Sequence, residues 1–198
     1  MLEYLVFIGA FLSLVSVYVY INSMLKGGAK PNRVSWLIWC IAPFIATAAA
    51  ISSGVRWAVL PVFMSGFGPF LVFIASFTIK KSYWRLAKFD YICGVLSALA
   101  LVLWIATKDP NIAILFSIAS DGLASVPTLT KAWAHPETES VWLYVVGVFN
   151  PFTALAAATA VTFVQYAFPI YLIIINIMLS LSVYNKKISR YVGIRINH

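Results

Sequence analysis

Long uncharged stretches alternate with short charged segments along the chain. A membrane-spanning helix needs roughly 20 apolar residues. Cut at its ionisable residues, the sequence leaves five uninterrupted stretches and a sixth broken only by Asp121: 4–25, 34–55, 57–79, 91–107, 140–185 and 110–130. The longest stretch is long enough for two helices and each of the others for one. The pattern predicts seven transmembrane helices, with the break in the longest stretch at 162–169 and the last helix at 165–184.

No stretch shows the two-residue alternation of a β-strand. Because lipid admits only helices and closed barrels, the fold class that follows is an all-α integral membrane protein, a bundle of seven transmembrane helices. Composition agrees: of 198 residues, 62% are hydrophobic and 10% are charged, and the mean hydropathy is +0.92. Soluble domains run near roughly 45–50% apolar and about 25% charged, so this composition excludes a soluble globular protein.

The positive charges gather on one side of the predicted bundle. The net charge is +8. Twelve of the 14 basic residues lie in the segments after the first, third, fifth and seventh predicted helices, and only Arg56 and Lys108 lie on the other side of the bundle. By the positive-inside rule these twelve face the cytoplasm, so we expect a multi-pass protein of the plasma (inner) membrane with its N-terminus outside and its C-terminus inside. The twelve are Lys26, Lys30, Arg33, Lys80, Lys81, Arg85, Lys88, Lys131, Lys186, Lys187, Arg190 and Arg195.

The same charges also offer a second interpretation. In the basic tail, 186–198, they would suit an anionic lipid or nucleic-acid patch. The ordinary strength of the positive-inside bias favours a topology anchor instead. We therefore expect the lipid bilayer as a partner and no nucleic acid.

The chain also resembles itself. Residues 23–31 match 128–136 at an offset of 105, and the pattern continues at an offset of 108. Matches between apolar residues arise easily by chance, but a proline inside a helix costs about 3 kcal/mol and is not scattered at random. The prolines in register are Pro43 with Pro151 and Pro61 with Pro169. We interpret the two parts as copies of one three-helix unit.

The helix between the copies has a topological role. A three-helix unit crosses the membrane an odd number of times, so one added helix gives both copies the same orientation. The predicted organisation is two parallel three-helix repeats joined by a linker helix. Its parts are a first repeat (1–80), a linker loop and helix (81–110), a second repeat (111–185) and a basic cytoplasmic tail (186–198).

This plan resembles that of the SWEET sugar transporters and PQ-loop proteins. The resemblance lies in the plan of three, one and three helices, in the basic loops after the first and fifth helices, and in particular residues. Those residues are Asn22 and Ser23, Pro127 and Thr128, Pro43 and Pro151. The family usually carries a proline–glutamine pair near the ends of helices 1 and 5, and this sequence has Asn22 at the first place and Pro127 at the second. Bacterial nicotinamide riboside carriers of the PnuC type are similar at a coarser level.

The resemblance implies a transporter that moves a small neutral, sugar-like solute by alternating access between the two repeats. It leaves open a carrier for nicotinamide riboside, another vitamin or an amino acid, and a membrane receptor of the same fold that transports nothing. The sequence does not specify the substrate, proton coupling or the oligomeric state. A homo-oligomer stays open.

Prolines within predicted helices are candidate hinges. Each removes a backbone hydrogen bond and permits a bend, which suits a transporter that rocks about a central site. The candidates are Pro43, Pro127 and Pro151, the prolines at positions that the resembling family also uses. The alternative is a static kink accommodated by neighbouring helices.

Polar residues inside the predicted spans are the candidate binding groups. Asp121 is the one acidic residue within a span, and it is a proton-coupling group, a substrate partner or a structural acid. In register it aligns with Ser16. Asn150 and Asn176 carry amides that suit a hydroxyl-bearing or amide ligand, or that bond across helices.

Tryptophans are the remaining candidates. Trp39 lies one turn inside its helix and is placed to stack on a ring. We expect Trp36 and Trp142, near the starts of the second and sixth helices, to belong to an interfacial aromatic belt.

The sequence offers little material for catalysis. Cys40 and Cys93 lie in separate apolar stretches, and no His, Cys, Asp and Glu residues are spaced for a metal. No phosphate loop or nucleophile elbow is present. We expect neither an enzyme nor a metal or other cofactor.

Overall fold

The computed structural model describes residues 4–78, 84–105 and 109–192, and over these residues it contains helices and no strand. Side-chain surroundings are described up to residue 185, apart from positions 100, 101 and 103–105. The prediction of an all-helical chain is confirmed for this part of the sequence. The α-helices are α1 (Leu5–Leu25), α2 (Arg33–Ser52), α3 (Leu60–Ala75), α4 (Lys88–Ile105), α5 (Pro110–Ala134), α6 (Val141–Ala157) and α7 (Phe163–Val192), with short 3-10 helices η2 (Trp57–Val59) and η3 (Pro136–Thr138).

Polar caps and glycines set several helix ends. Asn32 accepts hydrogen bonds from two backbone N–H groups in the first turn of α2, and Asp109 does the same for α5. Pro110 then occupies the first position of α5, where a missing N–H costs nothing. Gly27 and Gly54 follow α1 and α2 with φ of 80° and 81°, a left-handed conformation that stops a helix and favours glycine.

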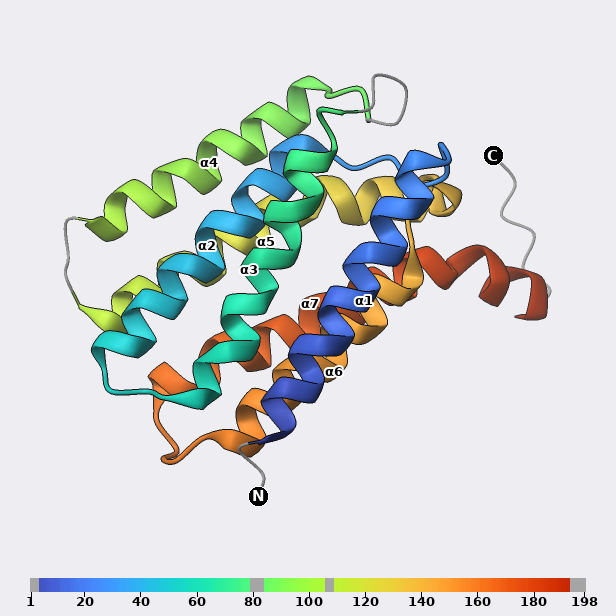
Figure 1. Ribbon diagram of the computed structural model, residues 1–198. Coiled ribbons are helices and arrows are strands. Elements are labelled where there is room, and N and C mark those ends of the chain that lie inside the picture. The colour runs from blue at the N-terminus through green and yellow to red at the C-terminus, as the bar shows by residue number, and fades with distance from the viewer. Residues whose placement is uncertain (1–3, 79–83, 106–108, 193–198) are drawn as a thin grey trace.

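We call α1, α2 and α3 the first set of helices and α5, α6 and α7 the second set. In each set, the third helix lies between the first and the second. α3 packs against both α1 and α2, and α7 packs against both α5 and α6. Figure 1 shows α3 in this middle position, between α2 and α1. The two sets therefore share one packing order.

The two sets meet through corresponding helices. α1 packs against α6, and α2 packs against α5, so each contact pairs the first helix of one set with the second helix of the other. Exchanging the two sets leaves this pattern unchanged, as a two-fold relation requires. The starts of the helices also correspond: Leu5 lies 105 residues before Pro110, and Arg33 lies 108 residues before Val141.

The linker helix α4 stands at the edge of the bundle. It packs mainly along α5 and more lightly along α2, and Figure 1 shows it on the outside of the other helices. It does not lie between the two sets.

Two boundaries differ from the prediction. α6 ends at Ala157 and α7 begins at Phe163, so the break in the longest apolar stretch lies at 158–162, earlier than the predicted 162–169. Pro169 lies inside α7, as the predicted last helix implies, and the Gln165 side chain accepts a hydrogen bond from the Thr159 N–H at 2.9 Å across the break. α7 also continues to Val192, so the first part of the predicted tail is helical.

Within the described residues, five helical segments are long and apolar enough to cross a membrane, and α6 is a shorter apolar helix. Large apolar side chains such as Phe7, Phe11 and Tyr18 are exposed along α1, and similar residues are exposed on α4, α6 and α7. An apolar exterior of this kind is what a multi-pass membrane protein presents to lipid. Of the predicted basic residues, Lys80, Lys81, Lys108 and Arg195 lie outside the described residues, as do the side chains of Lys186, Lys187 and Arg190.

Candidate functional site

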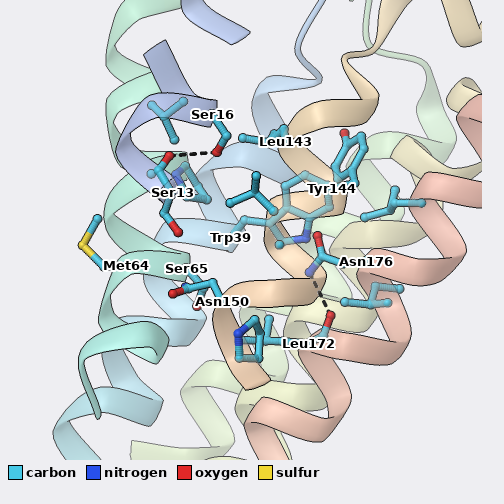
Figure 2. A pocket seen from close by; sticks show the side chains of 18 of the residues that line it. Ser13, Ser16, Trp39, Met64, Ser65, Leu143, Tyr144, Asn150, Leu172 and Asn176 are labelled. Carbon is cyan, nitrogen blue, oxygen red and sulfur yellow. Dashed lines mark hydrogen bonds between the residues drawn. The ribbon is translucent and has the colours of Figure 1, made fainter. Parts of the chain in front are cut away.

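A cavity of about 100 Å³ lies between the two sets of helices. Side chains from α1, α2, α3, α5, α6 and α7 line it, so both sets contribute to its wall. Figure 2 shows several of these side chains pointing toward one another across the space. The volume holds several water molecules but lies below the roughly 300–1,000 Å³ typical of ligand pockets.

All four residues predicted to bind a solute reach this cavity. Trp39 comes from α2, Asp121 from α5, Asn150 from α6 and Asn176 from α7. They lie far apart in the sequence, and the helix packing brings them to one place. Their contact with a solute stays a prediction.

Asp121 is buried and bonded to its neighbours. Its side chain is 3% exposed, and its Oδ2 accepts a hydrogen bond from the Tyr171 hydroxyl on α7 at 2.7 Å. The Trp39 indole N–H donates to the Ser125 hydroxyl at 3.0 Å, and that hydroxyl donates to the Asp121 carbonyl at 2.8 Å. This arrangement joins α2, α5 and α7 around the carboxylate.

The two asparagines make different contacts. The Asn150 amide donates to the Pro61 carbonyl at 3.0 Å and therefore ties α6 to α3. Its Oδ1 lies against Gly9 of α1, where an added Cβ would approach it to 2.6 Å. The Asn176 amide donates to the Leu172 carbonyl of its own helix at 2.8 Å, as Figure 2 shows. The Asn150 amide therefore links two helices, while the Asn176 amide bonds within α7 and lines the cavity.

The two halves of the wall exchange large and small side chains. At an offset of 108 residues, Trp39 corresponds to Gly147 and Gly68 corresponds to Asn176, and all four line the cavity. The first set thus has its large residue on the second helix, and the second set has its larger residue on the third. A Cβ added to Gly147 would lie 2.7 Å from the Asn176 side-chain carbon, so the missing side chain makes room for the amide.

This close approach predicts that Gly147→Ala destabilises the chain by about 1–3 kcal/mol, because a methyl group has no free space there. Shortening the facing residue in Gly147→Ala/Asn176→Ala should restore most of the loss. The matched control is Gly122→Ala, since an added Cβ there would meet only Tyr171 at 3.7 Å, an ordinary contact. Thermal unfolding in detergent measures all three, and equal losses in the two alanine single variants would contradict the argument.

The predicted hinges differ in their relation to the cavity. Pro151 lines it, whereas Pro43 and Pro127 are buried within α2 and α5 and do not. A proline leaves the carbonyl four residues before it without its helical donor. For Pro43 and Pro151 those carbonyls belong to Trp39 and Gly147, which occupy corresponding places in the wall. A hinge role for all three stays a prediction.

One tryptophan prediction was wrong. Trp36 is 1% exposed, lines the cavity and packs between the rings of Tyr20 and Trp39, so it does not belong to an interfacial belt. It points inward because α2 packs against both α3 and α5 and has little free surface. Trp142 is 64% exposed on α6, as a belt residue would be.

A buried ion pair closes one end of the bundle. Lys131, at the end of α5, pairs with Glu139, which follows η3, and both side chains are almost fully buried. The Tyr20 and Tyr144 hydroxyls donate to Glu139 Oε2 at 3.2 and 2.7 Å, and Lys131 also donates to the Lys30 carbonyl at 2.5 Å. We call Tyr20, Lys131, Glu139 and Tyr144 the end cluster. It joins both sets of helices beyond the cavity.

Several of these residues were missed by sequence reasoning. Ser16 had one signal, its alignment with Asp121 in the repeat. Ser125 and Tyr171 had none, since a serine or tyrosine in an apolar helix is common. Glu139 lies just before the uncharged stretch 140–185, in a predicted connection, so nothing in the sequence indicated that it is buried beside Lys131.

The wall chemistry suits reversible binding of a small polar molecule. It combines one carboxylate, amides and hydroxyls with aromatic and aliphatic surface, the usual make-up of a small-molecule site. Among the described residues, no group of three metal-ligating side chains gathers at the cavity or elsewhere. No protein-family model, curated protein or solved structure matches this chain.

Proposed function

We propose that the chain is a membrane transporter that moves a small solute through the cavity by alternating access. The observation that carries this proposal is a cavity with polar groups in a largely apolar wall, lined by two three-helix sets with the same packing order. Many transporters place their substrate site near the middle of the membrane, at the interface of two structural repeats. A cavity within an apolar exterior is what such a site requires.

The proposed membrane plan has seven spans, α1 to α7. α6 is 17 residues long, about 26 Å at 1.5 Å per residue, and spans a hydrocarbon core near 30 Å only with its flanking residues. The basic connections after α1, α3 and α5 meet at one end: the Lys30 N–H bonds to the Thr138 carbonyl, and the Trp84 N–H bonds to the Pro31 carbonyl. We assign this end to the cytoplasm and the N-terminus to the outside.

Labelling of single cysteines tests this orientation, with the two buried native cysteines replaced. Cysteines introduced at Lys26 and Ala87, both exposed at the basic end, should be protected from an impermeant thiol reagent added to intact cells. Cysteines at Ser53 and Ala160, exposed at the other end, should react. Reaction at Lys26 or Ala87 from outside would reverse the proposed topology.

In the proposed mechanism, the structure corresponds to a state closed at the cytoplasmic end. The end cluster holds both sets together there, and separation of the sets would open the cavity on that side. Bending at Pro43 would let α2 tilt relative to α3. Bending at Pro127 and Pro151 would let α5 and α6 tilt relative to α7. The small volume of the cavity agrees with a closed state that widens as it opens.

A flux assay tests transport directly. Purified protein in liposomes should take up one class of labelled solute from a panel of sugars, nucleosides, amino acids and amines, and protein-free liposomes should not. The variant Ser125→Ala, which removes the hydroxyl joining Trp39 to the Asp121 carbonyl, should lower uptake severalfold. Its matched control is Ser97→Ala on α4, a buried serine that bonds to the Cys93 carbonyl and does not line the cavity. No uptake across the whole panel would favour a receptor instead.

The neutral, sugar-like solute implied by the SWEET and PQ-loop resemblance is the starting expectation for this panel. Carriers for nicotinamide riboside, other vitamins or amino acids are the alternatives. The wall chemistry narrows this choice, as argued next.

A further inference from the structure

Asp121 carries the carboxyl group of the cavity wall, and no described lining residue carries a cation to balance it. Asp121 lines the cavity, and its one hydrogen-bond partner through Oδ2 is the neutral Tyr171 hydroxyl. Among the residues that the structure describes, no lysine, arginine or histidine lines the same space. A buried carboxylate without a counter-charge is strongly unfavourable, so Asp121 takes up either a proton or a cationic ligand.

Several hydrogen-bond donors of the wall are in use, while the buried Trp36 indole N–H has no partner among the described residues and the Asn150 and Asn176 amides each have a second N–H. Six lining side chains each donate to an acceptor of the protein itself, and most of those acceptors are backbone carbonyls: Ser16, Trp39, Ser65, Ser125, Asn150 and Asn176. A hydroxyl has one proton and two lone pairs, so a serine that donates to a carbonyl still accepts from a ligand. The wall therefore offers acceptors to a ligand, namely serine lone pairs and the Asn150 Oδ1, which has no partner within the described residues.

Prolines leave further backbone acceptors without a helical partner in residues of the wall. Three lining residues, Trp39, Ser65 and Gly147, each stand four positions before a proline inside the helix. Their carbonyls lack the N–H that an uninterrupted helix would supply. A ligand that donates hydrogen bonds satisfies such groups, and a ligand that only accepts does not.

Aromatic rings complete the wall. Trp36 and Trp39 pack edge to face at 5.4 Å, and Tyr144 lines the cavity from the opposite set. Aromatic faces attract a cation through their quadrupole, with tryptophan the strongest. Carboxylate, free acceptors and aromatic rings thus favour the same kind of ligand.

We propose that the cavity binds a small primary ammonium, an organic cation with N–H donors, in preference to a neutral sugar-like solute. The ammonium supplies a positive charge to pair with the Asp121 carboxylate and N–H donors for the acceptors of the wall. This inference rests on the proposed function, because it assigns the solute class to the same cavity. The volume of about 100 Å³ requires the bound cation to be small.

Three probes of nearly equal shape and different charge test the preference in the unmodified protein. Isobutylamine is protonated at neutral pH, isobutanol is neutral, and isobutyrate is an anion. Binding is measured by calorimetry and by the thermal shift of the protein in detergent, since a ligand of the folded state raises its melting temperature. We expect the amine to bind at least tenfold more tightly than the alcohol, and the anion not to bind.

Two carboxylate variants locate the effect. In Asp121→Asn the dissociation constant of isobutylamine should rise at least tenfold, because the wall loses its charge. In the control Asp109→Asn, which removes an exposed carboxylate outside the cavity and keeps a helix cap, it should not change. Equal binding of amine and alcohol, no binding of the amine, or an unaltered constant in Asp121→Asn would each overturn the proposal.

These outcomes are separate from those of the transport assay. Binding of the amine without any flux would uphold the cation site and contradict transport. Flux of a neutral solute without binding of the amine would uphold transport and contradict the cation site.

Discussion

Replacing Lys131 with methionine should destabilise the folded chain by about 3–5 kcal/mol. The side chain is 1% exposed, and its ammonium group neutralises Glu139 while it donates to the Lys30 carbonyl. Without it, a buried carboxylate keeps only the two tyrosine hydroxyls of the end cluster as partners. Thermal or denaturant unfolding in detergent micelles measures the loss.

Two further variants separate the ion pair from side-chain size. Lys131→Met/Glu139→Leu removes both charges and should recover much of the stability, because no uncompensated ion remains. Lys26→Met removes an exposed lysine at the same end and should change stability by less than about 0.5 kcal/mol. A Lys131→Met variant as stable as Lys26→Met would contradict a buried, stabilising pair.

The variant Trp39→Ala should lower the free energy of unfolding by about 3–5 kcal/mol. The ring is 7% exposed, packs against Trp36 and bonds across to Ser125 on α5. Its loss leaves an enlarged cavity and removes a contact between the two sets. Trp39→Phe keeps an aromatic ring and loses the indole N–H, so it should cost about 1 kcal/mol for the hydrogen bond in addition to its smaller volume.

The matched control is Trp142→Ala, which removes the same kind of side chain from a position that is 64% exposed. Its unfolding in micelles should differ from that of the parent by no more than about 0.5 kcal/mol. If Trp39→Ala and Trp142→Ala unfold alike, Trp39 does not join the two sets.

The helices could be predicted from the long uncharged stretches between the charged segments. Such stretches favour helices. Prolines in register such as Pro43 and Pro151 predicted a repeat, which stays a prediction, while the two three-helix sets have the same packing order. The misplaced break shows the limit of this reasoning. An uncharged stretch long enough for two helices does not specify where the first ends, and here α6 ends at Ala157.

The candidate site was predictable only for residues that are costly in an apolar helix. Asp121, Asn150 and Asn176 stand out because an unsatisfied polar group in lipid is unfavourable, and all three reach the cavity. Tyr171 and Trp36 do not stand out, because an aromatic residue is equally at home in a core, at an interface or beside a ligand. Their places follow from helix rotation and packing, which apolar composition does not specify.

The end cluster was unpredictable for a related reason. Lys131 has the position and charge of a topology signal, and the positive-inside rule gives no information on whether such a lysine is buried. Its partner Glu139 lies in the connection to α6, and the pair forms only because α5 ends beside that connection.

Access to the cavity from both sides of the membrane tests transport most directly, because it requires no knowledge of the solute. Ser16 is buried and lines the cavity. The variant Ser16→Cys is treated with an impermeant thiol reagent in vesicles of either orientation. A cysteine at Ser97, buried on α4 and not among the lining residues, is the control and should react from neither side. The account predicts that the Ser16 variant reacts from both sides, since each opening of the cavity exposes it in turn. Reaction from one side only, or from neither, would contradict alternating access.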